Sequence, residues 1–417
     1  MKKWAAGLLC LCLLLGICPE CSAAQAPEPF RLVVGTDLHY ISPALNDKGP
    51  FFRDLLDRGD GKTSLFCEEL TDAFLEEVCR LKPDALLLTG DLSFNGALES
   101  HRDLVQKLRA VEAAGIPVLV LTGNHDVYCG SAARFEGESY TLVPSATTES
   151  FREIYAEFGW DEALSRDVES LSYCYALNDG TRILMLDANT ARYSSALPPD
   201  TVSWVEQQLK DAAKQGCQIF VACHQNLLQH SMFDYGYVLT QSAALLKLFQ
   251  KYDVRLCLSG HLHMQHVMEK NGVTEIATSA LCSYPCQYGV LAYANGVFQY
   301  HTQITDVSAW AKRQGREEEQ LQDFTAYAAS LFDRRTLSQT VPLLAESHLS
   351  PGQQASMNVF ACEVNRSYFS GHMEGYEALD PDGSLRELWV NTGSLYGYYL
   401  DSIQSDAGNN YNEWTIG

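Results

Sequence analysis

The chain has 417 residues, of which 46% are hydrophobic and 20% are charged, and these proportions are those of a globular protein with a sizeable core. They exclude a disordered or low-complexity chain, and the length allows two or three domains. Its 30 Lys and Arg against 52 Asp and Glu give a formal net charge of −22, so the protein's field repels long polyanions. We therefore expect neither a long nucleic acid nor an anionic lipid surface as partner, whereas a small phosphate compound held through metal is compatible with this charge.

Residues 1–24 have the pattern of a signal peptide. Lys2 and Lys3 precede an apolar run from Trp4 to Ile17, and the small residues of 22–24 suit a cleavage site. The run is shorter than the roughly 20 residues that cross a bilayer. We expect export from a bacterial-type cell, to the extracellular space or the cell envelope, with no membrane span after cleavage. An uncleaved anchor is the alternative.

From residue 30 onward, short apolar runs alternate with segments of helical periodicity. The runs predict six strands, at Arg31–Gly35, Asp84–Thr89, Pro117–Thr122, Thr181–Leu186, Gln218–Cys223 and Arg255–Ser259. The periodic segments predict four helices, at Leu65–Leu81, Leu98–Ala114, Thr201–Gln215 and Gln241–Tyr252. A meander follows, with predicted strands at Val273–Ala280, Gly289–Ala294 and Val297–Ile304. This order favours an α/β fold, a layered β-sandwich flanked by helices.

After about residue 304 the composition changes. Val307–Phe332 is charged and helical in period, Pro342–Pro351 has the residues of a loop, and Tyr368–Trp414 is rich in Tyr, Gly and Asn. We therefore predict a main domain over 30–304, whose sheets are complete at its end, and a smaller C-terminal α+β appendage over 305–417. We expect the appendage's tyrosines to pack within it, and a wall of a substrate pocket is their alternative use.

The residues that can carry chemistry stand at the ends of the predicted strands. In open α/β sheets, ligands bind beyond the carboxyl ends of the strands. Five strand ends bring carboxylates, imidazoles and one amide to a single rim: Asp37, His39, Asp91, Asn124, His125, Asp126, His224, His261 and His263. These donors suit divalent zinc, iron or manganese, and one carboxylate can bridge two ions. The pattern therefore predicts a dinuclear centre with two divalent transition metal ions.

Local spacing adds two expectations. Asp37 with His39, and His261 with His263, are two residues apart, which places each pair on one face of an extended segment. Glycines precede three of the motif residues, and we expect them to let the backbone turn sharply toward the ions.

These motifs occur in the order Asp-x-His, Gly-Asp, Gly-Asn-His-Asp, a lone His, and Gly-His-x-His. In that order they resemble the calcineurin-like metallophosphoesterase superfamily over about residues 31–304. The second block, Gly90–Gly96, lacks the Asp-Arg pair of many phosphatases in the superfamily. The resemblance is therefore to cyclic-nucleotide-phosphodiesterase-like or nucleotidase-like branches rather than to protein phosphatases.

The resemblance implies two ligand sets that share Asp91 as a bridge: Asp37, His39 and His263 for one metal, and Asn124, His224 and His261 for the other. It implies that His125 protonates the leaving oxygen or stabilises phosphoryl charge, and that Asp126 orients His125. The resemblance implies a dinuclear-metal hydrolase of a small phosphate ester, above all a phosphodiester, in which a metal-bridging hydroxide attacks the phosphorus in line with the leaving group. Together with the signal-peptide pattern, this predicts an exported enzyme.

Three alternatives stand beside this interpretation. A phosphomonoesterase or nucleotidase would use the same site. A catalytically silent binding scaffold would have lost ligands, whereas every motif position here is filled. A metallo-β-lactamase-like hydrolase needs a His-x-His-x-Asp-His block, which is absent.

Two further patterns carry less. Gly59–Ser64 contains the Gly-Lys-Thr ending of a phosphate loop, but Leu56 stands where that motif needs Gly, and no strand leads into it. We therefore predict a polar loop before the 65–81 helix. Cys282 and Cys286 flank a Tyr-Pro turn, and whether they form a disulfide stays open.

Overall fold

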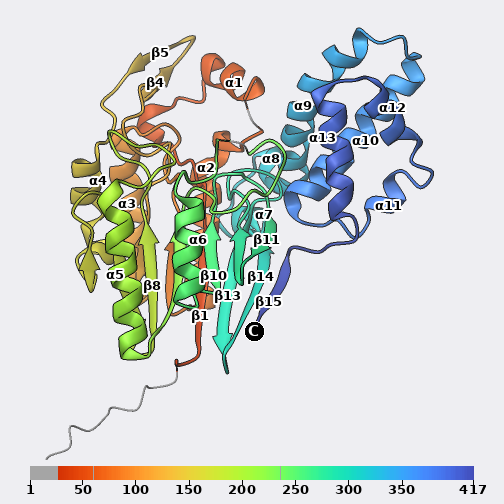
Figure 1. The fold of residues 1–417 in the computed structure, drawn as a ribbon. Coiled ribbons are helices and arrows are strands. Elements are labelled where there is room, and N and C mark those ends of the chain that lie inside the picture. The colour runs from red at the N-terminus through yellow and green to blue at the C-terminus, as the bar shows by residue number, and fades with distance from the viewer. Residues whose placement is uncertain (1–26, 60, 235) are drawn as a thin grey trace, which may run out of the picture.

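The computed structural model describes residues 27–417 except residues 60 and 235, so the predicted signal segment lies outside the described residues. Two β-sheets pack face to face, helices cover their outer faces, and a helical lobe projects from one side (Figure 1). The expected layered α/β fold is confirmed. Within the described ranges, none of the helices combines the length and the apolarity needed to span a bilayer.

The first sheet has six strands in the order β15-β14-β13-β1-β2-β3. Their bounds are β1 Phe30–Gly35, β2 Ala85–Leu88, β3 Val118–Val120, β13 Gln287–Ala294, β14 Val297–Ile304 and β15 Glu413–Ile416. β1, β2 and β3 are parallel, and β13, β14 and β15 continue the sheet antiparallel from β1.

The second sheet has seven strands in the order β11-β12-β10-β9-β8-β7-β6. Their bounds are β6 Ser165–Arg166, β7 Tyr173–Asn178, β8 Thr181–Leu186, β9 Gln218–Cys223, β10 Leu256–Ser259, β11 His266–Lys270 and β12 Val273–Ala277. β8, β9, β10 and β12 are parallel. Because helices or the other sheet cover both faces, the central strands are apolar throughout, which is why the sequence located them.

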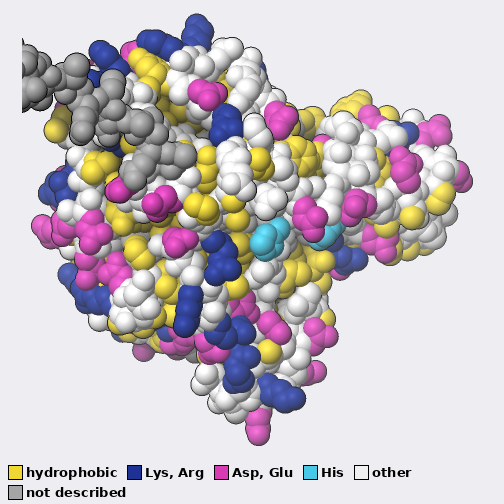
Figure 2. All heavy atoms as spheres, turned by 90° about the horizontal axis from the view of Figure 1, so that it is seen from below, with side chains coloured by type: hydrophobic (Ala, Val, Ile, Leu, Met, Phe, Trp, Pro, Cys, Tyr) yellow, Lys and Arg dark blue, Asp and Glu magenta, His cyan; other side chains and the backbone are white. Residues whose placement is uncertain are grey.

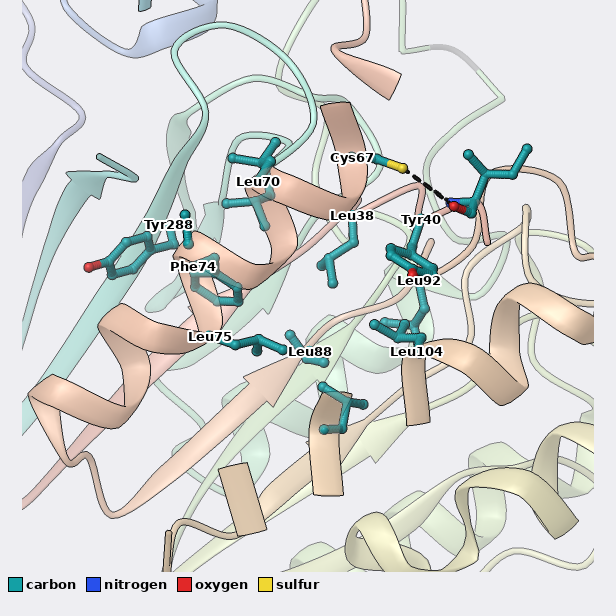
Figure 3. Packing of buried hydrophobic residues seen from close by; sticks show 14 of the residues in the cluster. Leu38, Tyr40, Cys67, Leu70, Phe74, Leu75, Leu88, Leu92, Leu104 and Tyr288 are labelled. Carbon is teal, nitrogen blue, oxygen red and sulfur yellow. Dashed lines mark hydrogen bonds between the residues drawn. The ribbon is translucent and has the colours of Figure 1, made fainter. Parts of the chain in front are cut away.

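Side chains along each strand alternate between two cores. Leu32 and Val34 of β1 face the second sheet, and Val33 faces the helices outside. The helices over the first sheet are α2 (Cys67–Leu81) and α3 (Leu98–Ala113), and those over the second are α5 (Pro199–Gln215) and α6 (Ser242–Lys251). In Figure 3, Phe74 and Leu75 of α2 lie over Leu88 of β2.

Several short elements lie at the end of the sheets where the motif residues gather. They are α1 (Pro50–Asp57), α4 (Thr148–Tyr155) and the hairpin of β4 (Ala133–Glu136) and β5 (Ser139–Leu142). None was predicted, because eight helical residues or four strand residues give too little periodicity to recognise.

The C-terminal lobe is helical, not α+β as expected. Its helices are α7 Val307–Arg313, α8 Glu319–Gln322, α9 Phe324–Ala345, α10 Pro351–Ser370, α11 Tyr376–Leu379, α12 Ser384–Asn391 and α13 Leu395–Ile403. A core around the fully buried Trp389 holds the end of α9 together with α10, α11, α12 and α13, whereas α7, α8 and the start of α9 pack into the core of the main domain. The predicted loop at Pro342–Pro351 is wrong at its start, since α9 continues through Pro342.

The chain then returns to the main domain. β15 lies beside β14 (Figure 1) and pairs with it antiparallel. This pairing places Trp414 opposite Tyr300 and buries Ile416. The expectation that the sheets are complete at residue 304 is therefore wrong. The described residues contain no disulfide bond, so the Cys282–Cys286 pairing left open is not formed.

Candidate metal centre

The carboxyl ends of β1, β2, β3, β9 and β10 bring the sequence motifs together. Potential ligand atoms form two groups, in each of which all atoms lie within 4.8 Å of one another: Asp37, His39, Asp91 and His263 in the first, and Asp91, His224 and His261 in the second. Asn124 adjoins the second group. The structure thus brings all seven residues of the implied ligand sets to one place.

In the first group, buried acceptor atoms converge. His263 Nε2 lies 3.2 Å from Asp37 Oδ1 and 3.3 Å from His39 Nε2. His39 Nε2 is in turn 3.5 Å from Asp91 Oδ2. Asp37 Oδ1 is buried and makes no hydrogen bond within the described part of the chain. A divalent cation satisfies such a set of carboxylate oxygens and imidazole nitrogens, so these residues fit a metal ion.

In the second group, a backbone contact decides which nitrogen of His224 is available. Its Nδ1 lies 2.9 Å from the Thr89 carbonyl oxygen, and an imidazole nitrogen must donate to a carbonyl, so Nδ1 carries the proton. The remaining nitrogen, Nε2, faces Asp91 Oδ2 at 3.4 Å and Asn124 Oδ1 at 3.2 Å. Three acceptors thus meet at one point, which fits a second metal ion.

Five of the motif residues have left-handed backbone conformations, with positive φ: Asp37 at 52°, His39 at 43°, Asp91 at 48°, His261 at 69° and His263 at 58°. The expectation of extended pairs is therefore wrong. Such conformations cost on the order of 1–3 kcal/mol each and persist where surrounding contacts hold them. Here the backbone N–H groups of Asp37 and His39 donate to the carbonyls of Gly90 and Asp91, both at 3.0 Å. Such a concentration of strained residues is typical of functional sites.

Two of the glycines have a role other than the expected sharp turn. Neither Gly123 nor Gly260 has positive φ. A Cβ on Gly123 would lie 2.1 Å from Asp91 Oδ1, and one on Gly260 would lie 2.0 Å from Thr36 Oγ1. These positions lack side chains because two loops meet there. Only Gly90, with φ of 99°, makes the turn that was expected.

The electrostatics of the site favour bound cations. Burial opposes charge on Asp37, but His263, and after it His39 and His224, hold the pKa of that carboxyl well below its usual value. Burial lowers the pKa of both His39 and His261 to about 3, so both rings are neutral, which is the state that binds metal. At His224 burial is outweighed by Asp91 and Asp37, which raise its pKa to about 9.

His125 and Asp126, the two expected catalytic residues, lie differently. The His125 ring lines the cavity above the donor groups, 4.8 Å from the His39 ring. Asp126 is fully buried, and its carboxylate accepts hydrogen bonds from the backbone N–H groups of Leu92, Ser93 and Gly123 at 2.8–3.1 Å. Asp126 therefore ties the β2 and β3 loops together, which differs from the expected role of orienting the His125 ring.

A cavity of about 690 Å³ opens over these groups, between the main domain and the helical lobe. The lobe lines it mainly with polar and aromatic side chains: Arg335, Thr336, Gln339, Asn365, Tyr368, Phe369, Tyr396 and Tyr399. Tyr368 and Tyr399 line this cavity and also belong to the lobe's core, as expected for tyrosines that pack within it.

Sequence reasoning missed several cavity residues of the main domain, among them two aromatic side chains and a lysine. Phe233 and Tyr237 come from the loop after β9, which carries no motif, and Lys62 comes from the Gly59–Ser64 stretch. The Gly-Lys-Thr pattern was the one signal available for Lys62.

Comparison with known families gives two matches. Residues 30–265 match the calcineurin-like phosphoesterase family, and residues 306–410 match the C-terminal domain of cyclic nucleotide phosphodiesterase.

Three curated relatives share parts of the chain. A glycerophosphodiester phosphodiesterase from Enterobacter lignolyticus is 29% identical over 34% of this chain and 42% of its own length. A probable cyclic nucleotide phosphodiesterase from Psychrobacter arcticus is 22% identical over 59% of this chain and 78% of its own. A cAMP/cGMP dual specificity phosphodiesterase from Mycobacterium tuberculosis is 25% identical over 48% of this chain and 55% of its own length.

Among solved structures, a dimetal phosphatase from Danio rerio covers 66% of this chain and 95% of its own, with 13% identity and a TM-score of 0.47. That likeness is too low to add to the family match.

Proposed function

The chain belongs to the calcineurin-like phosphoesterase family, a family of metal-dependent hydrolases, and we propose that it hydrolyses phosphodiesters with cyclic nucleotides as its substrates. One observation carries the proposal: two groups of metal-ligand atoms share Asp91 beneath a cavity large enough for a nucleotide. The relatives' activities and the match of residues 306–410 support the choice of substrate.

Each residue of the centre has a proposed task. Asp37, His39 and His263 would hold one metal ion, Asn124, His224 and His261 the other, and Asp91 would contact both. When bound, such ions supply Lewis-acid activation of the phosphate and of water. Manganese, iron and zinc all suit these donors.

His125 is the proposed proton donor to the leaving oxygen. Its ring lines the cavity and belongs to neither donor group. Burial lowers its pKa, which makes the protonated ring a stronger acid when it faces a developing alkoxide.

The cavity rim suits a planar base. Tyr237 is 47% exposed with its ring 4.9 Å from the His261 ring, and Phe233 is equally exposed with its ring 5.1 Å from that of Tyr399. A half-exposed aromatic side chain beside a phosphate site offers a face for stacking. A phosphate ester without a planar base, such as a glycerophosphodiester, would leave these rings unused.

The test is hydrolysis by residues 27–417 loaded with manganese, iron or zinc. We expect cyclic AMP, cyclic GMP and bis-p-nitrophenyl phosphate to be hydrolysed, p-nitrophenyl phosphate at less than about a tenth of that rate, and all activity to be lost with a chelator. Faster hydrolysis of the monoester would instead indicate a phosphomonoesterase or nucleotidase. Metal binding without any hydrolysis would indicate a binding scaffold.

We further propose that the protein is exported, on the basis of the basic and apolar pattern of residues 1–24. Expression of the full chain in a bacterium tests this. We expect protein outside the cytoplasm with Gln25 as its first residue, and full-length protein in the cytoplasmic fraction would contradict it.

A further inference from the structure

Lys62 is a buried lysine for which the proposed metal centre gives no account. It follows α1 rather than a strand and precedes the 3₁₀ turn Ser64–Phe66, so the stretch is not a phosphate loop of the usual kind. It is not a solvated loop either, because Lys62 is only 7% exposed and Thr63 is fully buried. Lysine is rarely this buried.

The backbone beside Lys62 is tied to the metal centre. Lys62 forms an antiparallel bridge with Ser283. The N–H and hydroxyl of Thr63 donate to the Cys282 carbonyl at 2.7 and 2.9 Å, and the Cys282 N–H donates to the carbonyl of Asp37 at 3.3 Å. Cys282 thus connects Thr63, the neighbour of Lys62, to the candidate metal ligand Asp37. These bonds fix the position of the Lys62 backbone relative to the metal centre.

The helical lobe closes the other side of the loop. Gly61 has φ of 81°, and a Cβ there would lie 3.3 Å from the Cα of Phe332 in α9. Between these supports, the Lys62 side chain lines the same cavity as Asp91 and His125. Its charge also lowers the pKa of His39 and His125, as expected for an ammonium group close to both rings.

The charge of Lys62 has a use at this place. Among the cavity-lining residues that the structure describes, Lys62 and Arg335 are the Lys and Arg side chains, in a protein of net charge −22. Arg335 belongs to α9, whereas the loop of Lys62 is joined to the backbone of Asp37 through Thr63 and Cys282. In phosphoryl transfer, negative charge is spread over the non-bridging oxygens in the transition state, and a fixed cation beside them stabilises it.

We propose that the Lys62 ammonium group donates a hydrogen bond to a non-bridging oxygen of the phosphate that is hydrolysed. This inference rests on the proposed function and adds a catalytic residue outside the family motifs. Lys62 binds the phosphate of the substrate and of the product, and it stabilises the charge that develops during the reaction.

The test compares Lys62→Gln and Lys62→Arg with Lys247→Gln, which removes an exposed charge on α6. The metal-loaded proteins are measured for metal content, for binding of inorganic phosphate by calorimetry, and for kcat/KM with methyl p-nitrophenyl phosphate. For Lys62→Gln we expect unchanged metal content, phosphate binding weakened at least about tenfold, and kcat/KM lowered by about 10²–10³. Lys62→Arg should recover at least about a tenth of wild-type kcat/KM, because it keeps a cation, and Lys247→Gln should match wild type.

Different results would contradict the Lys62 contact and the proposed function. A wild-type protein that hydrolyses no phosphodiester contradicts the function. A hydrolysing wild type whose Lys62→Gln variant binds phosphate and turns over within about twofold of it overturns the Lys62 contact. Activity lost together with the metal overturns it too, because Lys62 would then only support the centre. If Lys62→Gln is not recovered folded, Lys62→Met, of similar length and without charge, takes its place.

Discussion

The backbone N–H of His125 donates a hydrogen bond of 2.7 Å to Oδ1 of Asp91. That bond occupies one oxygen of the carboxylate and leaves Oδ2 to face both His39 and His224, at 3.5 and 3.4 Å. A single atom, Asp91 Oδ2, therefore stands between the two donor groups. The same bond is made by the backbone of His125, so it survives replacement of the His125 side chain.

Asp91→Asn should disable both metal positions, because the amide that replaces the carboxylate carries no charge between them. We expect less than about half of the wild-type metal content and under about 1% of its turnover. Elemental analysis and bis-p-nitrophenyl phosphate hydrolysis measure this, with Asp211→Asn at a half-buried position of α5 as the control. Full metal content and rate in Asp91→Asn would refute the proposed bridge.

His125→Ala should lower turnover without loss of metal, because its ring lies outside both donor groups. We expect kcat to fall by about 10²–10⁴ for a substrate with a poor leaving group. The loss should shrink for activated nitrophenyl esters, whose leaving groups need no proton. Equal losses for both kinds of substrate would show that His125 acts on the phosphoryl oxygens instead.

Leu395→Ala should affect substrate binding alone. Leu395 is 70% exposed at the first position of α13 and lines the cavity far in sequence from the metal ligands. We expect KM for cyclic AMP to rise by about 3–10-fold, because apolar contact with the bound nucleotide is lost, and kcat to stay the same. Tyr398→Ala, also exposed on α13 but outside the cavity, is the matched control. An unchanged KM would show that Leu395 does not contact the bound nucleotide.

Ile416→Ala should destabilise the whole protein. Ile416 is 7% exposed in the core between the sheets, although it is the penultimate residue of the chain. We expect the free energy of unfolding in urea to fall by about 2–4 kcal/mol. Thr415→Ala, on the exposed face of β15, should change it by less than about 0.5 kcal/mol.

A chain that ends near residue 305 should not fold, because it lacks β15 and the core contacts that β15 makes. A stable, metal-binding truncation of this kind would contradict the prediction.

His101 should make stability depend on pH. Its Nε2 donates to the carbonyl of Asp126 at 2.9 Å, its Nδ1 accepts from the Tyr155 hydroxyl at 3.0 Å, and burial lowers its pKa to about 4. The unfolded chain, with an ordinary histidine pKa near 6.5, binds more protons in the interval between these values, so stability falls as pH falls through it. On acidification from pH 7 to pH 5, protonation of His101 in the unfolded chain should lower the free energy of unfolding by about 2 kcal/mol.

Urea unfolding of wild type and His101→Gln at several pH values, both with chelator, isolates this contribution. The variant should be less stable at pH 7 and should lose less stability on acidification than wild type. Parallel pH profiles for the two proteins would show that His101 is already protonated, or exposed, in the folded state.

The amino-acid sequence determined the main domain and most of the candidate site. Strands such as Thr181–Leu186 and Gln218–Cys223 are apolar on both faces and stood out as buried strands at the bounds found in the structure. His224 follows β9 directly, and Asp37 and Asp91 come two and three residues after the ends of β1 and β2. Parallel strands end at one edge of a sheet, so the order of the motifs was enough to predict that these residues meet.

The tertiary structure alone decided what depends on contacts between distant segments. β15 is four residues long, which is too short for its sequence pattern to predict a strand, and it is stabilised by pairing with β14. The left-handed conformations of Asp37 and His263 are held by neighbouring loops rather than by local preference. Lys62 faces the cavity because hydrogen bonds through Cys282 tie its loop to Asp37, more than 200 residues away from that cysteine in the chain. Local sequence sets local backbone preference, whereas packing against another segment determines which surface a loop presents.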